Sequence, residues 1–152
     1  MFETIGANVR LLLSVTGVVE AVTGVALLLA PALLIEVLLG AVPDTPVGTT
    51  AARVAGAAVL SLAVACWFAR DDLEGNAARG LGIAMLFYNF AVAATLTLGW
   101  LRHGISGIAF WPVVAAHVGL GVWCVAVAGH GPASQNASGS RCSCSAVDAS
   151  LP

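Results

Sequence analysis

The chain has 152 residues, of which 59% are hydrophobic and 9% charged, and its formal net charge is −2. A soluble domain carries roughly a quarter of its residues as charged side chains. This composition cannot cover a water-facing surface, so lipid must surround much of the chain. The near-neutral charge also excludes the basic surface that nucleic-acid binding requires. The length allows one compact domain.

Four apolar stretches are each long enough to cross the roughly 30 Å hydrocarbon layer of a membrane as a helix. They are expected at about residues 9–30, 51–69, 80–101 and 108–128. Because lipid offers no hydrogen-bond partners, each stretch must satisfy its backbone internally, as a helix does. The connections are short, so we predict an all-α, up-down four-helix transmembrane bundle over residues 1–130. The Gly- and Ser-rich segment 131–152 is predicted to be a disordered tail.

Pro31 interrupts the first apolar stretch, which continues as far as Leu39. A proline inside a helix removes a backbone donor and clashes with the preceding turn. Two arrangements are open at this point. The first helix kinks at Pro31, or residues 31–39 form a separate short helix along the membrane interface.

The arginines predict the orientation. With four spans, both termini and the central connection share one side of the membrane. That side carries four arginines and the other side two: Arg10, Arg70, Arg79 and Arg141 against Arg53 and Arg102. The positive-inside rule therefore places both termini in the cytoplasm.

Glu20 lies in "TGVVEAVTG", one of the most apolar parts of the chain. A charged side chain at mid-span opposes insertion by roughly 2.5–3.5 kcal/mol, so Glu20 must avoid lipid. Thr16 and Gly24 lie four positions before and after it, on the same face of the helix. Small residues of this kind let membrane helices approach closely. We therefore expect Glu20 to point into the bundle.

Polar residues on other helices are expected at the same depth. With about 1.5 Å of rise per residue, Tyr88, Asn89 and His117 fall within roughly one turn of the level of Glu20, and so does Ser61. Glu20, Tyr88, Asn89 and His117 are called the mid-membrane cluster below. Two interpretations stay open. The residues only form hydrogen bonds between helices, or Glu20 carries a proton with His117 or Tyr88 as its partner.

The remaining charges receive structural interpretations. Glu36 and Arg53 lie near the outer ends of neighbouring spans, so we predict an ion pair that closes this hairpin. Arg10 and Arg70 are expected to reach the lipid headgroups by extending their side chains to the interface.

Several chemistries find no support in the sequence. His117 and His130 fall on one helix and His103 in a connection, so one chain cannot bracket a haem. No HExxH or comparable zinc cluster occurs, and neither does a phosphate-binding loop or a nucleophile elbow. We predict no catalytic residue, no metal site and no bound cofactor, with a quinone as the one candidate.

The four cysteines fall into two classes. Cys66 and Cys124 lie in apolar spans and are expected to behave as small hydrophobic residues. Cys142 and Cys144 form a CxC pair in the tail, a weak pattern for soft-metal binding or modification.

The predicted first helix contains Arg10, Gly17 and Gly24 and ends in "LLLAPALLIEVLLG", and the second contains "RVAGAAVLSLAVACWFAR". This pattern of glycines and arginines resembles the small four-helix bacterial membrane proteins grouped as DoxX-like. The resemblance covers about residues 9–130 and implies a bundle in the bacterial inner membrane. Some relatives are accessory subunits of quinone-linked oxidoreductases. The lysine that often follows the glycines of the first helix has no counterpart here.

Two functions follow as expectations. The leading one is a non-enzymatic accessory or interaction subunit, embedded in the lipid bilayer and packed against other membrane subunits or further copies of itself. Its contacts would use the small residues Ala52, Gly56, Ala115 and Gly119. The alternative is a proton-coupled carrier or binder of a small apolar or quinone-like molecule at the mid-membrane cluster.

Overall fold

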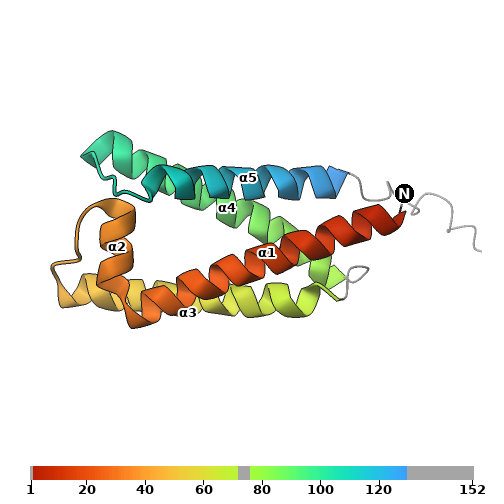
Figure 1. The fold of residues 1–152 in the computed structure, drawn as a ribbon, viewed down its shortest axis with the longest axis horizontal. Helices are drawn as coiled ribbons and strands as arrows, with labels where there is room; N and C mark the ends of the chain where they lie inside the picture. Colours follow the sequence, from red (N-terminus) through yellow and green to blue (C-terminus); the bar gives the residue numbers. More distant parts are fainter. Residues whose placement is uncertain (1, 72–75, 130–152) are drawn as a thin grey trace, which may run out of the picture.

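The computed structural model describes residues 2–71 and 76–129. This part of the chain forms five helices, labelled in Figure 1: α1 (Phe2–Leu29), α2 (Pro31–Leu39), α3 (Pro46–Ala69), α4 (Asn76–His103) and α5 (Phe110–Gly129). Four of them are long and apolar enough to cross a membrane, over Gly6–Leu29, Pro46–Ala69, Ala78–His103 and Phe110–Val127. The predicted all-α, multi-pass membrane fold is confirmed. The predicted tail, 131–152, lies outside the described residues.

The second span begins earlier than its apolar pattern suggests, at Pro46 rather than residue 51. Thr45 caps the helix, because its Oγ1 accepts a hydrogen bond from the backbone N–H of Gly48 at 3.1 Å. The hydroxyl of Thr50 donates to the backbone carbonyl of Pro46 at 2.8 Å. Proline at the first position and a threonine cap both favour a helix start. A hydropathy profile does not include these local contacts, so it places the start of the helix too late.

Pro31 begins a separate helix rather than kinking a longer one. α1 ends at Leu29, and α2 runs from Pro31 to Leu39. The C-cap residue Gly40, whose φ of 76° is left-handed, closes the helix. The carbonyls of Val37 and Leu38 accept hydrogen bonds of 3.0 Å from the N–H groups of Ala109 and Gly107. α2 therefore turns across the bundle and holds the connection that precedes α5 (Figure 1).

The four spans form two closely packed pairs, α1 with α3 and α4 with α5 (Figure 1). Glycines set the approach of α1 to α3. A Cβ on Gly24 would lie 2.8 Å from the backbone N of Leu60, and one on Gly56 would lie 2.9 Å from the Gly24 carbonyl oxygen. Between α4 and α5, the rings of Trp100 and Trp111 meet edge to face, with centroids 5.2 Å apart. Each pair is thus held by its own contacts.

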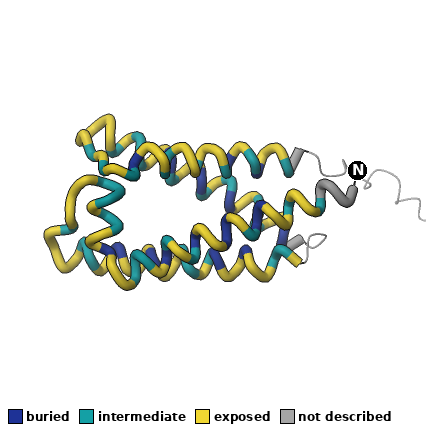
Figure 2. Tube along the Cα trace, viewed as in Figure 1, coloured by how far each residue is buried: buried dark blue, intermediate teal, exposed yellow. Residues whose placement is uncertain are grey.

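The apolar core joins the two pairs in one half of the bundle only. Its buried members are Leu12 and Leu13 of α1, Cys66 of α3, Met85 of α4 and Cys124 of α5. All of them lie in the half nearer the N-terminus, and Figure 2 shows the two pairs diverging beyond it. We call the end that carries α2 the open end. Cys66 and Cys124 are buried free thiols among apolar neighbours, as the sequence suggested.

The charged residues pair differently from the prediction. Arg10 and Arg70 both contact Asp71, at 3.0 and 3.4 Å, and their extension to the headgroups stays a prediction. Within the described residues, Glu36 and Arg53 form no ion pair, so that prediction is wrong. It rested only on both residues lying near the outer ends of neighbouring spans. Because α2 is a separate helix that turns across the bundle, Glu36 does not face Arg53.

Candidate functional site: the mid-membrane cluster

Glu20 lies inside the bundle, with 1% of its surface exposed. Thr16, one turn earlier on the same face of α1, is also buried. The hydroxyl of Tyr88 on α4 donates a hydrogen bond of 3.1 Å to Glu20 Oε2. This bond crosses from one helix pair to the other. The sequence expectation that Glu20 avoids lipid thus corresponds to a specific contact between α1 and α4.

The second carboxyl oxygen of Glu20 has no such contact. Oε1 is buried and has no hydrogen-bond partner among the described residues. No arginine in the described part of the chain lies within ion-pair distance of Glu20. A buried carboxyl with one bonded and one free oxygen can hold a proton on the free one, and an ionisable group inside a membrane is a candidate functional group.

Asn89 and His117 form the second half of the cluster. Asn89 is fully buried on α4, and its Nδ2 donates to the backbone carbonyl of Met85 at 2.8 Å. Its Oδ1 lies 2.9 Å from Nδ1 of His117 on α5. The rings of Tyr88 and His117 meet edge to face with centroids 5.8 Å apart. The cluster therefore consists of two hydrogen-bonded pairs joined by a ring contact.

The structure brings together all four residues that the sequence placed at one depth, from three helices. It leaves out Ser61, which is exposed on α3 and donates to the carbonyl of Ala57 at 2.9 Å. Depth follows from counting residues, but the direction in which a side chain points depends on how each helix is rotated in the bundle. The sequence analysis also missed the Met85 carbonyl, although the four-residue spacing to Asn89 is typical of such a bond.

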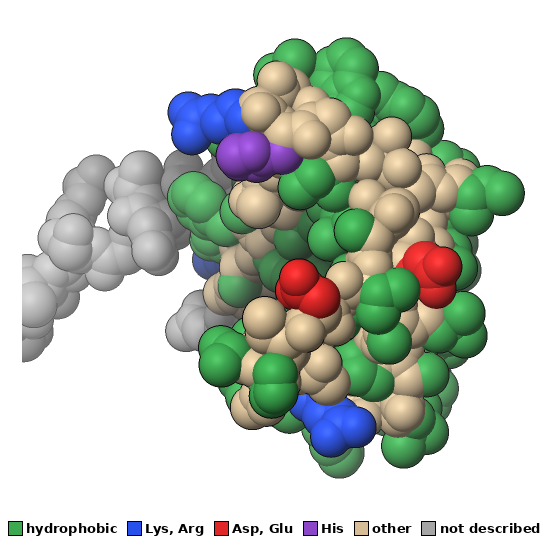
Figure 3. Space-filling view, turned by 90° about the vertical axis from the view of Figure 1, so that its left-hand side faces the viewer, with side chains coloured by type: hydrophobic (Ala, Val, Ile, Leu, Met, Phe, Trp, Pro, Cys, Tyr) green, Lys and Arg blue, Asp and Glu red, His purple; other side chains and the backbone are tan. Residues whose placement is uncertain are grey.

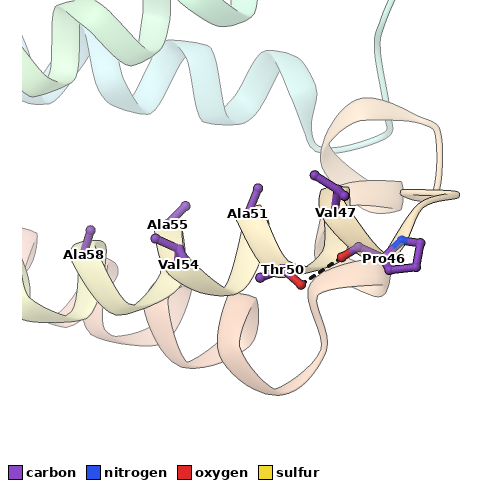
Figure 4. Close-up of a pocket in the computed structure, with 7 residues that line it drawn as sticks. All are labelled: Pro46, Val47, Thr50, Ala51, Val54, Ala55 and Ala58. Carbon is purple, nitrogen blue, oxygen red and sulfur yellow. Dashed lines mark hydrogen bonds between the residues drawn. The ribbon is translucent and has the colours of Figure 1, made fainter.

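An apolar groove lies along the first half of α3, from Pro46 to Ala58. Its volume is about 690 Å³, and seven residues of α3 line it: Pro46, Val47, Thr50, Ala51, Val54, Ala55 and Ala58. Figure 4 shows Ala51, Ala55 and Ala58 pointing from α3 toward α4 and α5. One turn beyond Ala58, Leu62 packs against the core. The groove is thus the inward face of α3 where the other pair no longer covers it.

Figure 3 looks onto the open end, where the molecular surface is hollowed. The hollow is lined mainly by hydrophobic side chains, with charged side chains around it. A molecule of mostly apolar character would therefore meet apolar walls along α3.

No group of three or more His, Cys, Asp or Glu side chains that could hold a metal ion occurs within residues 2–71 and 76–129. Cys142 and Cys144 lie outside the described residues, so the interpretation of that pair stays a prediction.

The small-residue surface expected to contact partners divides into two parts. Ala52 and Gly56 are buried, and Gly56 packs against Gly24 of α1, so they are not available to another protein. On α5, Ala115 and Gly119 are exposed, and a Cβ added to Gly119 would meet nothing within 4 Å. Of these four residues, only Ala115 and Gly119 of α5 are open to a partner.

Comparisons with protein families, with curated proteins and with solved structures find no match for this chain. The resemblance to DoxX-like proteins therefore stays a prediction. What the protein does has to be inferred from the geometry of the mid-membrane cluster and the groove.

Proposed function

We propose that this protein is a non-enzymatic membrane protein that binds a small, mostly apolar molecule with one polar end. The apolar part occupies the groove along α3, and the polar end lies at the mid-membrane cluster. One observation carries the proposal: the bundle holds both an apolar groove along α3 and a buried polar cluster on the other three spans, and the proposed ligand would join the two.

The dimensions and the chemistry of the groove support this function. Its volume of about 690 Å³ lies within the range of small-molecule sites, which combine apolar walls with a few polar groups. Quinone-like molecules have this build, with an apolar body and a polar ring. Because the groove opens toward lipid, such a molecule can enter from the bilayer without passing through water.

Glu20 gives the proposed site a proton carrier. Its Oε1 has no hydrogen-bond partner, and its Oε2 is bonded to Tyr88, whose ring contacts His117. Uptake or release of a proton by Glu20 would accompany binding, as in a proton-coupled carrier.

The groove is tested by filling it. Native mass spectrometry of the protein, extracted gently with its own lipids, should detect a bound small molecule. Ala55→Phe, which places a ring in the groove, should abolish this signal. Ala57→Phe is the matched control, because Ala57 is exposed on α3 but does not line the groove. Equal occupancy in both variants would contradict the proposed location.

A second function, an accessory subunit, is supported by the open glycines of α4 and α5. Added Cβ atoms on Gly80, Gly82 and Gly119 would meet nothing within 4 Å. Faces of this kind let another transmembrane helix approach closely. A specific partner should be lost with Gly119→Leu and retained with Ala57→Leu. Retention in both variants would exclude α5 as the contact surface.

For the cellular location we propose a bacterial inner membrane with both termini in the cytoplasm. The distribution of the arginines supports this orientation.

A further inference from the structure

We infer that the bundle binds an anionic phospholipid at the end that carries the N-terminus. One acyl chain lies in the seam between α1 and α3, and the phosphate group lies at Arg10 and Arg70. The inference goes beyond the proposed function, because this site shares no lining residue with the groove along the first half of α3. It narrows the sequence expectation that both arginines reach headgroups to one class of lipid and one place on the bundle.

A second apolar groove runs along the seam between α1 and α3. Its volume is about 350 Å³, and its walls are Gly17, Val18 and Ala21 of α1 with five residues of α3 between Leu60 and Phe68. The stretch from Leu60 to Phe68 is roughly 12 Å long, and it ends one residue before α3 does. One leaflet of the hydrocarbon layer is roughly 15 Å thick. The groove therefore spans most of one leaflet, as the acyl chain of a lipid does.

Two arginines lie at the membrane-surface end of this seam. Trp67 lines the groove, and the guanidinium carbon of Arg70 lies 3.4 Å from the centroid of its ring. Nη2 of Arg10 lies 3.0 Å and Nε of Arg70 3.4 Å from separate carboxyl oxygens of Asp71. On α1, Arg10 precedes Gly17 by about two helical turns, so the two residues share one face of the helix. Both helices thus lead from the apolar groove to the arginines.

Asp71 does not neutralise both arginines. Two guanidinium groups share one carboxylate, so the three side chains keep one net positive charge. Each guanidinium has five N–H groups, and those not directed at Asp71 have no hydrogen-bond partner within the described residues. Asp72 and Glu74, which follow in the sequence, lie outside that part of the chain.

This arrangement favours an anionic headgroup. Arginine binds phosphate through charge-assisted hydrogen bonds, and basic sites between membrane helices bind anionic lipids. A zwitterionic lipid offers the same acyl chain but no net charge to match the arginines. In the orientation proposed above, this end lies at the cytoplasmic leaflet, whose surface is negatively charged.

The headgroup is tested by native mass spectrometry of the full chain with equimolar phosphatidylglycerol and phosphatidylcholine that carry the same acyl chains. One net charge near the membrane surface predicts roughly fivefold stronger binding of phosphatidylglycerol. Arg10→Gln and Arg70→Gln should each remove most of this preference, while Arg10→Lys, which keeps the charge, should retain most of it. Arg102→Gln is the matched control, because Arg102 is exposed in the last turn of α4.

The acyl chain is tested by filling the seam. Val18→Phe should weaken lipid binding, and Val22→Phe should not. Both valines are exposed on α1, and only Val18 lines the groove. Equal binding of the two lipids, or a preference that persists in Arg10→Gln and Arg70→Gln, would overturn the inference. So would lipid binding that Val18→Phe leaves unchanged. A dimer that Val18→Phe dissociates, with no preference between the lipids, would assign the seam to a second copy of the chain instead.

Discussion

The hydroxyl of Tyr88 donates to Glu20 Oε2 across 68 positions of the sequence and between the two helix pairs. Tyr88 also packs against the apolar core. The bond therefore joins the two helix pairs beside that core. Its strength and its chemistry can be tested separately from the identity of any ligand.

Removal of the Tyr88 hydroxyl should weaken the contact between the pairs. We expect Tyr88→Phe to lower stability by about 1 kcal/mol, the usual size of a hydrogen bond between membrane helices. Thermal unfolding in lipid nanodiscs measures this. In a double-mutant cycle with Glu20→Leu, most of the loss should disappear. Thr97→Val is the matched control, since its hydroxyl bonds only to the Ala93 carbonyl of its own helix. Additive effects of the two substitutions on stability would mean that the hydrogen bond between Tyr88 and Glu20 does not stabilise the protein.

Replacement of the ionisable group should separate packing from proton exchange. Glu20→Gln keeps the volume of the side chain and an oxygen that accepts from Tyr88, so the fold should persist. Binding in the groove should lose its dependence on pH, because the amide cannot exchange a proton in this range. Glu36→Gln, exposed on α2, is the control and should leave that dependence unchanged. Measuring small-molecule binding in the groove as a function of pH tests this prediction. A pH dependence that persists in Glu20→Gln would rule out Glu20 as the proton carrier.

The close approach of α1 and α3 requires a glycine at position 56. A Cβ there would lie 2.7 Å from that of Leu27 and 2.9 Å from the Gly24 carbonyl oxygen, so the helices would have to move apart. Gly56→Ala should destabilise the protein by about 1–3 kcal/mol. Gly119→Ala, which meets nothing within 4 Å, should be neutral or slightly stabilising because alanine favours the helix. Unfolding temperatures compare the two, and equal effects would contradict the packing described for α1 and α3.

The proposed orientation can be checked by labelling thiols in intact cells with a membrane-impermeant maleimide. Asp44 is exposed between α2 and α3, so Asp44→Cys should react from outside when Cys142 and Cys144 are replaced by serine. The unaltered chain should react only after the cells are permeabilised. Cys66 and Cys124 are buried and should contribute no label. The opposite pattern would reverse the orientation.

Residue counting predicted the depth of the cluster but not the direction of each side chain. Glu20, Tyr88, Asn89 and His117 meet, whereas Ser61 points away although it lies at a similar depth. Depth along a helix is a local quantity, because each residue adds the same rise. Direction depends on the rotation of a helix against its neighbours, which side chains on other helices determine.

The small residues show the same limit. The sequence marked Ala52, Gly56, Ala115 and Gly119 as surfaces for close packing, and nothing in their pattern says which of them pack within the chain. Gly56 meets Gly24 of α1, while Gly119 remains open. The failed ion pair of Glu36 with Arg53 has a related cause, because the turn at Ala30 sends α2 across the bundle.

Composition by itself determined that this is a helical, multi-pass membrane protein, because lipid requires long apolar segments with internally bonded backbones. The position of Glu20 within an apolar stretch also determined that its side chain had to face inward, because exposure of a carboxyl to hydrocarbon is costly. Only the tertiary structure decided which polar groups meet Glu20 and that the helix pairs diverge beyond them. Those features depend on close contacts between residues far apart in the sequence, such as Gly24 with Gly56 and Tyr88 with Glu20.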